Sequence, residues 1–184
     1  MQAWLTLITD LAEAVAGFEN SRLRYGYARY AVFLAEGHLR RDDRATARSL
    51  IDTVLEISRS TGYLHSEGVA CWLTAECLAP EDAAAAEPYV ENAMEILERI
   101  GARNDLARAM VTRAALRQAA GDLAKARELL EQAGGIFHEL GTLDEPARVE
   151  AARAALDRGA AMPPSEQARA RPEFRTHQAR LLCR

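Results

Sequence analysis

Aromatic residues, cysteine, proline and glycine are all scarce in this 184-residue sequence, which has 6% aromatics, 3 cysteines, 6 prolines and 11 glycines. An odd number of cysteines without a spaced framework excludes a disulfide scaffold and indicates reduced thiols, so we expect a cytoplasmic protein. No apolar run approaches the ~18 residues of a membrane span. The N-terminal segment lacks basic residues, and Asp10 and Glu13 interrupt its apolar run. We therefore expect neither a signal peptide nor contact with a membrane.

Strand patterns are also lacking, because no segment alternates apolar and polar residues for long enough. Alanine supplies much of the 49% hydrophobic fraction, and 27% of the residues are charged. This composition favours closely packed helices and predicts an all-α protein. The formal net charge is −4, with arginine concentrated from Arg158 onward and an acidic remainder. That balance argues against direct nucleic-acid binding.

Motifs for phosphate and metal binding are missing as well. The sequence contains no G-x-x-x-x-G-K-[ST], no H-E-x-x-H and no C-x-x-C. Cys71 and Cys77 do not share a helix face at their spacing, and the histidines are scattered. The acidic residues mostly alternate with arginine, which is typical of a solvated helix face. We expect no catalytic residues, no metal site and no cofactor.

A repeat is present instead. Three segments of equal length, residues 47–62, 86–101 and 126–141, align with apolar residues at shared positions and end in a glycine. Gly62, Gly101 and Gly141 are 39 and 40 residues apart, and we expect each to end a helix in the left-handed conformation. Another helix is expected before each segment, over residues 27–40, 68–79 and 107–120. Self-similarity at this fixed period indicates an array of helix pairs.

Acidic residues mark the turns within these pairs. Asp43 and Asp122 are expected to cap the following helices by accepting hydrogen bonds from free amides. In the middle pair the turn is Pro80-Glu81-Asp82. Because Pro88 is tolerated only near a first turn, we expect that helix to begin near Glu87, with residues 83–86 irregular or in a separate turn.

The ends differ from the array. Residues 1–21 predict a leading amphipathic helix with one apolar stripe, formed by Trp4, Ile8, Leu11, Val15 and Phe18. After Gly141, a capping helix with Pro146 in its first turn would present Val149, Ala152 and Leu156 to the array. We assign residues 22–158 to three helix pairs plus this cap, and residues 159–184 to a flexible basic tail.

The unit resembles a tetratricopeptide repeat. The third pair has small and apolar residues and a Gly-Asp turn at that family's spacing: Ala114, Gly121-Asp122, Ala126, Leu130 and Ala133. The period departs from the family's ~34 residues. Residues 128–149 are also similar to the last repeats of bacterial multidomain ATPase/cyclase proteins and of LuxR-type signalling regulators. The resemblance implies an α-solenoid of antiparallel helix pairs in a right-handed superhelix.

In that family the first helix of each pair lines a concave groove that binds a peptide or a helix. Carrying the geometry over predicts eight partner-binding residues: Arg29, Val32, Glu36, Val69, Trp72, Glu76, Arg108 and Val111. Trp72 suits either an anchor in the groove or packing between helices. The leading hypothesis is a non-catalytic protein-interaction module. The alternative is a self-association or regulatory segment of a larger bacterial signalling or transcription regulator, in which residues 2–18 form a homodimer.

Overall fold

The computed structural model describes residues 2–142 and 145–161, and this part of the chain is entirely helical, with eight helices and no strand. The all-α prediction is thereby confirmed. The helices are α1 (Gln2–Asn20), α2 (Arg24–Leu39), α3 (Arg44–Thr61), α4 (Leu64–Leu78), α5 (Ala83–Arg99), α6 (Arg103–Ala119), α7 (Leu123–Leu140) and α8 (Glu145–Ala161).

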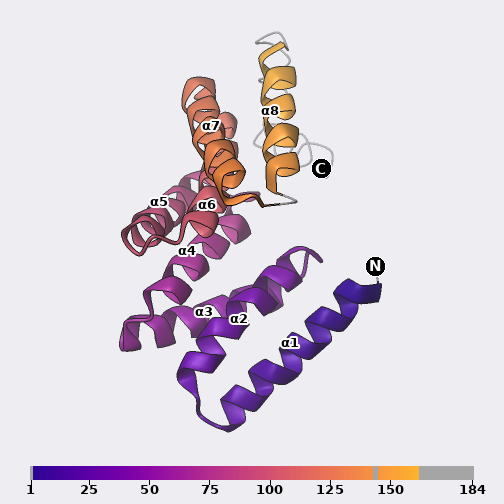
Figure 1. Cartoon of the computed structure of the whole chain (residues 1–184), viewed down its shortest axis with the longest axis vertical. Helices are drawn as coiled ribbons and strands as arrows, with labels where there is room; N and C mark the ends of the chain where they lie inside the picture. Colours follow the sequence, from indigo (N-terminus) through magenta and orange to yellow (C-terminus); the bar gives the residue numbers. More distant parts are fainter. Residues whose placement is uncertain (1, 143–144, 162–184) are drawn as a thin grey trace, which may run out of the picture.

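Consecutive helices pack against each other along the whole chain, from α1 and α2 at one end to α7 and α8 at the other (Figure 1). The most extensive contacts lie within the expected pairs α2–α3, α4–α5 and α6–α7. The helices α2, α4, α6 and α8 also contact one another in sequence. We call these four the first-helix layer, because α2, α4 and α6 each begin a pair.

The three repeated glycines end helices as predicted. Gly62, Gly101 and Gly141 have φ of 74°, 70° and 65°, in the left-handed region that glycine adopts without a steric penalty. The amide that follows each glycine donates to a carbonyl five residues earlier, at 3.1, 2.9 and 3.2 Å. Arg22 has the same backbone conformation, with φ 56°, and the amide of Leu23 makes the equivalent bond at 3.0 Å. Helix α1 therefore ends in the same way as α3, α5 and α7, in the position of the second helix of a pair.

Aspartate caps all three helices that follow the turns within pairs. The side chains of Asp43, Asp82 and Asp122 accept hydrogen bonds from the amides of Thr46, Ala85 and Lys125. The prediction of a late start for the middle helix is wrong, because α5 begins at Ala83 and contains Pro88. The Asp82 cap and the complete burial of Ala86 hold the first turn in place, although the proline supplies no amide to its own turn.

Small residues bring the paired helices together. The alanines at the repeat positions of Ala114 and Ala126 are 0–2% exposed, in the third pair and, as Ala35 and Ala47, in the first. Gly68 has the same role in α4, since a Cβ there would lie only 3.0 Å from side-chain atoms of Leu97. The core is continuous through α1–α6, and a second cluster joins α6, α7 and α8. Met94 and Met110 pack against both clusters.

The two ends agree with most of the expected pattern. Ile8 and Val15 of α1 are buried, and Leu11 and Phe18 pack against the same core; the Trp4 side chain lies outside the described set. The expected capping helix exists as α8, with Val149 and Leu156 each 1% exposed. It continues to Ala161, and residues 162–184 of the expected basic tail lie outside the described residues. None of the described helices is both long and apolar enough to cross a bilayer.

Candidate functional site

The first-helix layer brings together residues that are far apart in the sequence. Arg108 of α6 lies at its centre, with a side chain that is 10% exposed. Its guanidinium pairs with Glu36 of α2 and lies 3.3 Å from Glu145 Oε1 of α8 and 3.7 Å from Asp105 Oδ1. One arginine thus connects three of the four helices in the layer.

Trp72 of α4 supplies the floor of this cluster. The guanidinium carbon of Arg108 lies 4.4 Å from the centre of the Trp72 ring, in a cation–π arrangement. The indole Nε1 donates to Thr112 Oγ1 at 2.8 Å, and the Thr112 hydroxyl in turn donates to Glu76 Oε1 at 2.9 Å. We call the whole set the Arg108 network: Glu36, Trp72, Glu76, Asp105, Arg108, Thr112 and Glu145.

Glu76 is a buried carboxylate whose proton affinity is raised by its surroundings. Burial raises its pKa, because the charged form loses hydration inside the layer. The hydrogen bond from Thr112 and the charges of Arg148 and Arg108 oppose this effect, while the charge of Glu36 adds to it. The net direction is upward, so desolvation outweighs the stabilising partners.

The eight predicted partner-binding residues divide into two groups. Seven are buried or partly buried, in the interior or in the Arg108 network, and one is exposed. Val32, Val69 and Trp72 are 1%, 5% and 1% exposed, so Trp72 packs between helices instead of standing open to solvent. Glu36 and Glu76 are partly buried, and so are Arg108 and Val111. Arg29 alone of the eight is exposed.

Three members of the network were not predicted. Thr112 follows the predicted residue Val111 by one position. Asp105 belongs to the acidic residues that alternate with arginine, which were expected on a solvated helix face. Glu145 belongs to the expected capping helix. Nothing in its sequence context indicates that the first turn of α8 would lie next to Arg108 in the first-helix layer. Only the packing of α8 against α6 shows this.

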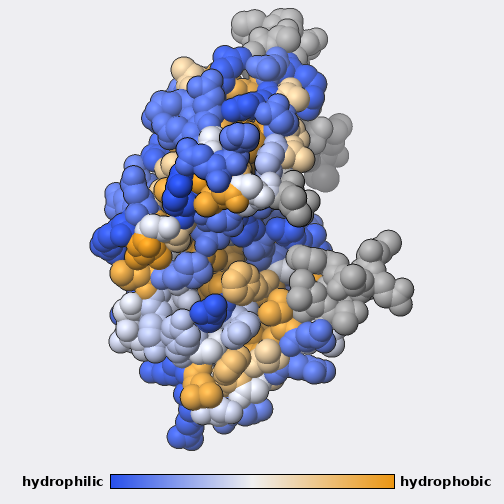
Figure 2. Space-filling model, viewed as in Figure 1, coloured by the Kyte–Doolittle hydropathy of each residue, from blue (hydrophilic) through white to orange (hydrophobic). Residues whose placement is uncertain are grey.

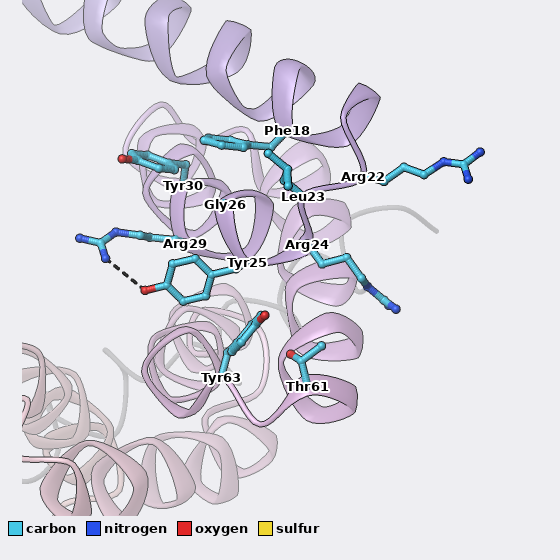
Figure 3. Close-up of a pocket in the computed structure, with 10 residues that line it drawn as sticks. All are labelled: Phe18, Arg22, Leu23, Arg24, Tyr25, Gly26, Arg29, Tyr30, Thr61 and Tyr63. Atoms are coloured by element: carbon cyan, nitrogen blue, oxygen red, sulfur yellow. Dashed lines mark hydrogen bonds between the residues drawn. The ribbon is translucent and has the colours of Figure 1, made fainter.

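A second feature lies beside the turn between α1 and α2. A cavity of about 580 Å³ is bordered by aromatic side chains and by arginines (Figure 3). Tyr25 meets Tyr63 edge to face at 4.9 Å, and Phe18 stacks on Tyr30 at 5.3 Å. Arg29 donates to the Tyr25 hydroxyl at 3.2 Å. In Figure 3, Arg22 and Arg24 extend outward, away from these rings.

The buried cysteines and the possible metal ligands form no further candidate site among the described residues. Burial raises the pKa of both Cys71 and Cys77, so their thiols stay protonated. Asn92 donates to Cys71 Sγ at 3.3 Å. Among the side chains that the structure describes, no group of three or more His, Cys, Asp or Glu could hold a metal ion.

Comparison with known proteins found no match for this chain among family models, curated proteins or solved structures.

Proposed function

We propose that this protein is a non-catalytic protein-interaction module, a tetratricopeptide-like α-solenoid that binds a peptide or a helix on the concave side of its first-helix layer. The observation that carries the proposal is the alternation of contacts. Helix α2 contacts α4, α4 contacts α6, and α6 contacts α8, so these four helices share one surface. A surface of this kind, built from repeated helices, suits the binding of extended or helical segments.

The Arg108 network supports the proposal through its composition. An arginine and a tryptophan lie together at the centre of the layer, and these residue types are enriched at binding hot spots. Acidic groups from α2, α6 and α8 surround them. A partner that carries arginine or lysine would find carboxylates there already held in place by internal hydrogen bonds and ion pairs.

The test selects peptides from a phage-displayed random library, with the full chain as bait, and measures their binding by calorimetry. Ala115 of α6 is exposed one helical turn beyond Val111, whereas Ala124 is exposed on α7, outside the layer. The Ala115→Arg substitution should weaken binding of the selected peptides by about tenfold or more, by adding bulk and charge to the layer. The matched Ala124→Arg substitution should leave it unchanged.

Two results would contradict the proposal. One is a library that yields no enriched peptide. The other is equal binding by the Ala115→Arg and Ala124→Arg proteins, which would place the site elsewhere on the molecule. Circular dichroism of both variants separates a lost site from a lost fold.

A further inference from the structure

The cavity beside the turn between α1 and α2 shares no residue with the Arg108 network. Of the ten described residues that line it, four are aromatic and three are arginine, and none is acidic (Figure 3). Its volume of about 580 Å³ lies in the range of small-molecule sites, which are mostly apolar with a few polar groups that orient the ligand. The cavity therefore has the size and the composition of a ligand site.

Large exposed apolar side chains gather around this cavity. Of the six in the described part of the chain, Leu23, Tyr25 and Tyr30 line the cavity, and Phe33 follows on the same helix. In the view of Figure 2, hydrophobic residues form a band over α1, while most of the surface over α5–α8 is hydrophilic. Exposed apolar residues that are concentrated in one place mark binding sites, whereas scattered ones do not.

The next helix pair does not repeat this arrangement. Arg29 and Tyr30 of α2 lie 40 residues before Val69 and Ala70 of α4. Helix α2 contacts α4, and Val69 and Ala70 are 5% and 0% exposed. Arg29 and Tyr30 are exposed. The cavity is therefore a feature of the first pair and not of the repeat.

Arg22 stands at a cavity wall where the repeat otherwise has glycine. Its φ of 56° is close to the values at Gly62, Gly101 and Gly141, which end the later helices in the same way. A residue with a Cβ is sterically disfavoured in this conformation, and arginine lacks the short polar side chain with which asparagine or aspartate compensates. Backbone strain of this kind points to a function of the side chain.

The arginines at the cavity have no anionic partner within the described part of the chain. Arg22 and Arg24 form neither an ion pair nor a side-chain hydrogen bond there, and Arg29 donates only to the Tyr25 hydroxyl. All three arginines are exposed. They are therefore available to an anion from outside the chain.

The third pair shows how such an arginine is neutralised within the chain. Arg103 follows its closing glycine by two residues, as Arg24 follows Arg22, and it pairs with Glu139 of α7. Glu139 precedes Gly141 by two residues, and the equivalent residue of the first pair is Ser60. The first pair thus keeps the cation of this ion pair and lacks the carboxylate.

The side chains divide the cavity into an aromatic half and a cationic half. Tyr25 and Arg29 are four residues apart and share a face of α2, whereas Arg24 and Arg29 lie about 140° apart around the helix axis. In Figure 3, Arg22 and Arg24 extend to one side of the start of α2. Arg29 lies on the other side, beside the rings of Tyr25 and Tyr30. A ligand that uses both halves needs a planar aromatic group at one end and an anionic group at the other, roughly one helix diameter away.

We propose that this cavity binds a free nucleotide, with its base against the exposed tyrosine rings and its phosphate on Arg22 and Arg24. Stacking of a base on an aromatic ring and pairing of arginine with phosphate are the contacts that the two halves supply. The sequence has no glycine-rich phosphate loop, so side chains hold the phosphate in place of backbone amides. The formal net charge of −4 favours a single nucleotide over a nucleic-acid strand, because an acidic protein repels a polyanion.

The first experiment measures the binding of adenosine monophosphate to the full chain by calorimetry. Adenosine, which lacks the phosphate, and ribose 5-phosphate, which lacks the base, are measured beside it. The whole nucleotide should bind at least about tenfold more tightly than either fragment. Its affinity should fall with added salt, because salt screens the attraction between arginine and phosphate.

Three results of this experiment would overturn the proposal. The first is that none of the common ribonucleoside monophosphates binds. The second is that inorganic phosphate binds as tightly as the nucleotide, which would indicate a simple anion site. The third is that single-stranded RNA binds with an affinity that rises with its length, which would indicate a nucleic-acid surface.

Arginine substitutions test the cationic half. The Arg22→Gly/Arg24→Ala protein should bind adenosine monophosphate about tenfold more weakly or worse and should bind adenosine unchanged. Because glycine suits the left-handed turn, this protein should melt no lower than the wild type. The matched control is Arg41→Ala, at an exposed arginine in the turn between α2 and α3, which should bind like the wild type. Unchanged nucleotide binding by the double variant would contradict the assignment of the phosphate.

Tyr25 tests the aromatic half. The Tyr25→Leu substitution should weaken the binding of adenosine monophosphate and of adenosine alike, by about fivefold or more, because it removes a ring on which a base stacks. Tyr25→Phe keeps the ring and should keep most of the affinity. Equal binding by the Tyr25→Leu protein and the wild type would exclude this contact. Ala115→Arg, which alters the proposed peptide surface, should leave nucleotide binding unchanged, so the two proposals are tested separately.

Discussion

Arg29 and Arg108 occupy the same position in their helix pairs but have different surroundings. Arg108 pairs with carboxylates from three helices and covers a tryptophan ring. Arg29 has a single hydrogen bond, to a tyrosine on its own helix. The position within the repeat sets the direction of each side chain. The neighbouring helices decide whether that side chain supports the fold or remains available to a partner.

The same contrast separates two regions of the molecule. Within the first-helix layer, opposite charges from different helices form ion pairs although they are far apart in sequence. At the α1–α2 end, acidic and basic groups are closer in sequence but do not pair among the described residues. Removing one partner of a mostly buried ion pair changes the stability of the fold more than removing an exposed charge, because solvent screens exposed charges. The region around Arg108 should therefore be sensitive to substitution, and the α1–α2 region tolerant.

The largest effect is expected from the Leu73→Ala substitution. Leu73 is fully buried, so removing its side chain should lower the free energy of unfolding by about 3 kcal/mol through lost burial and a residual cavity. Phe33→Ala, at the equivalent position of α2, should cost at most about 1 kcal/mol in the monomer. Urea denaturation under conditions where the wild type is monomeric measures both. Similar losses would show that the two positions are not in different surroundings.

Arg108→Ala should give the next largest effect. It removes the arginine that Glu36, Asp105 and Glu145 share in a partly buried site, although Glu36 keeps Arg40 and Glu145 keeps Arg148. The stability loss should be on the order of 3 kcal/mol or somewhat less. The control is Arg29→Ala, which should unfold at nearly the same urea concentration as the wild type. Equal midpoints for the two variants would mean that the Arg108 network contributes nothing to folding.

Glu76→Gln should give the smallest effect, and one that stabilises. Burial raises the pKa of Glu76. The stability that a raised carboxyl pKa contributes is fully present below the ordinary glutamate pKa and is lost as the pH rises through the folded value. A neutral amide escapes this loss and still accepts from Thr112, so the variant should melt a few degrees higher than the wild type at neutral pH.

Thermal melts across the acidic and neutral range provide the check. The advantage of Glu76→Gln should shrink as the pH falls through the raised pKa of Glu76, and it should be gone below the ordinary glutamate pKa. Glu131→Gln, an exposed substitution on α7, should show no such trend. A Glu76→Gln protein that is less stable than the wild type at every pH would show that the charged carboxylate is favoured in the fold.

Much of the architecture was predictable from the sequence because it depends on local interactions. The closing glycines, the aspartate caps and the helix that follows Gly141 were all predicted and are all present. The predicted first helices of the pairs begin too late. The structure starts α2, α4 and α6 a few residues earlier, since the tight turns after Arg22, Gly62 and Gly101 leave almost no connecting loop.

The candidate site was less predictable. Repeat alignment identified Glu36, Trp72, Glu76 and Arg108, and these four do meet in one network. It could not show that Arg108 pairs with Glu36, because Glu36 is on α2, two helices away in the first-helix layer. Nor could it show that α1 ends in a left-handed turn at Arg22, since an arginine in such a turn does not have glycine's sequence signal.

By itself, the sequence determined the helices, their caps, their period and the small residues where paired helices touch, because each of these depends on residues a few positions apart. Only the tertiary structure decided which charges are paired. Burial and ion pairing depend on which helices lie next to each other, and helices far apart in the chain supply the partners of Arg108. The same dependence leaves Arg29 and Phe33 of α2 exposed, although the equivalent positions of α4 are buried.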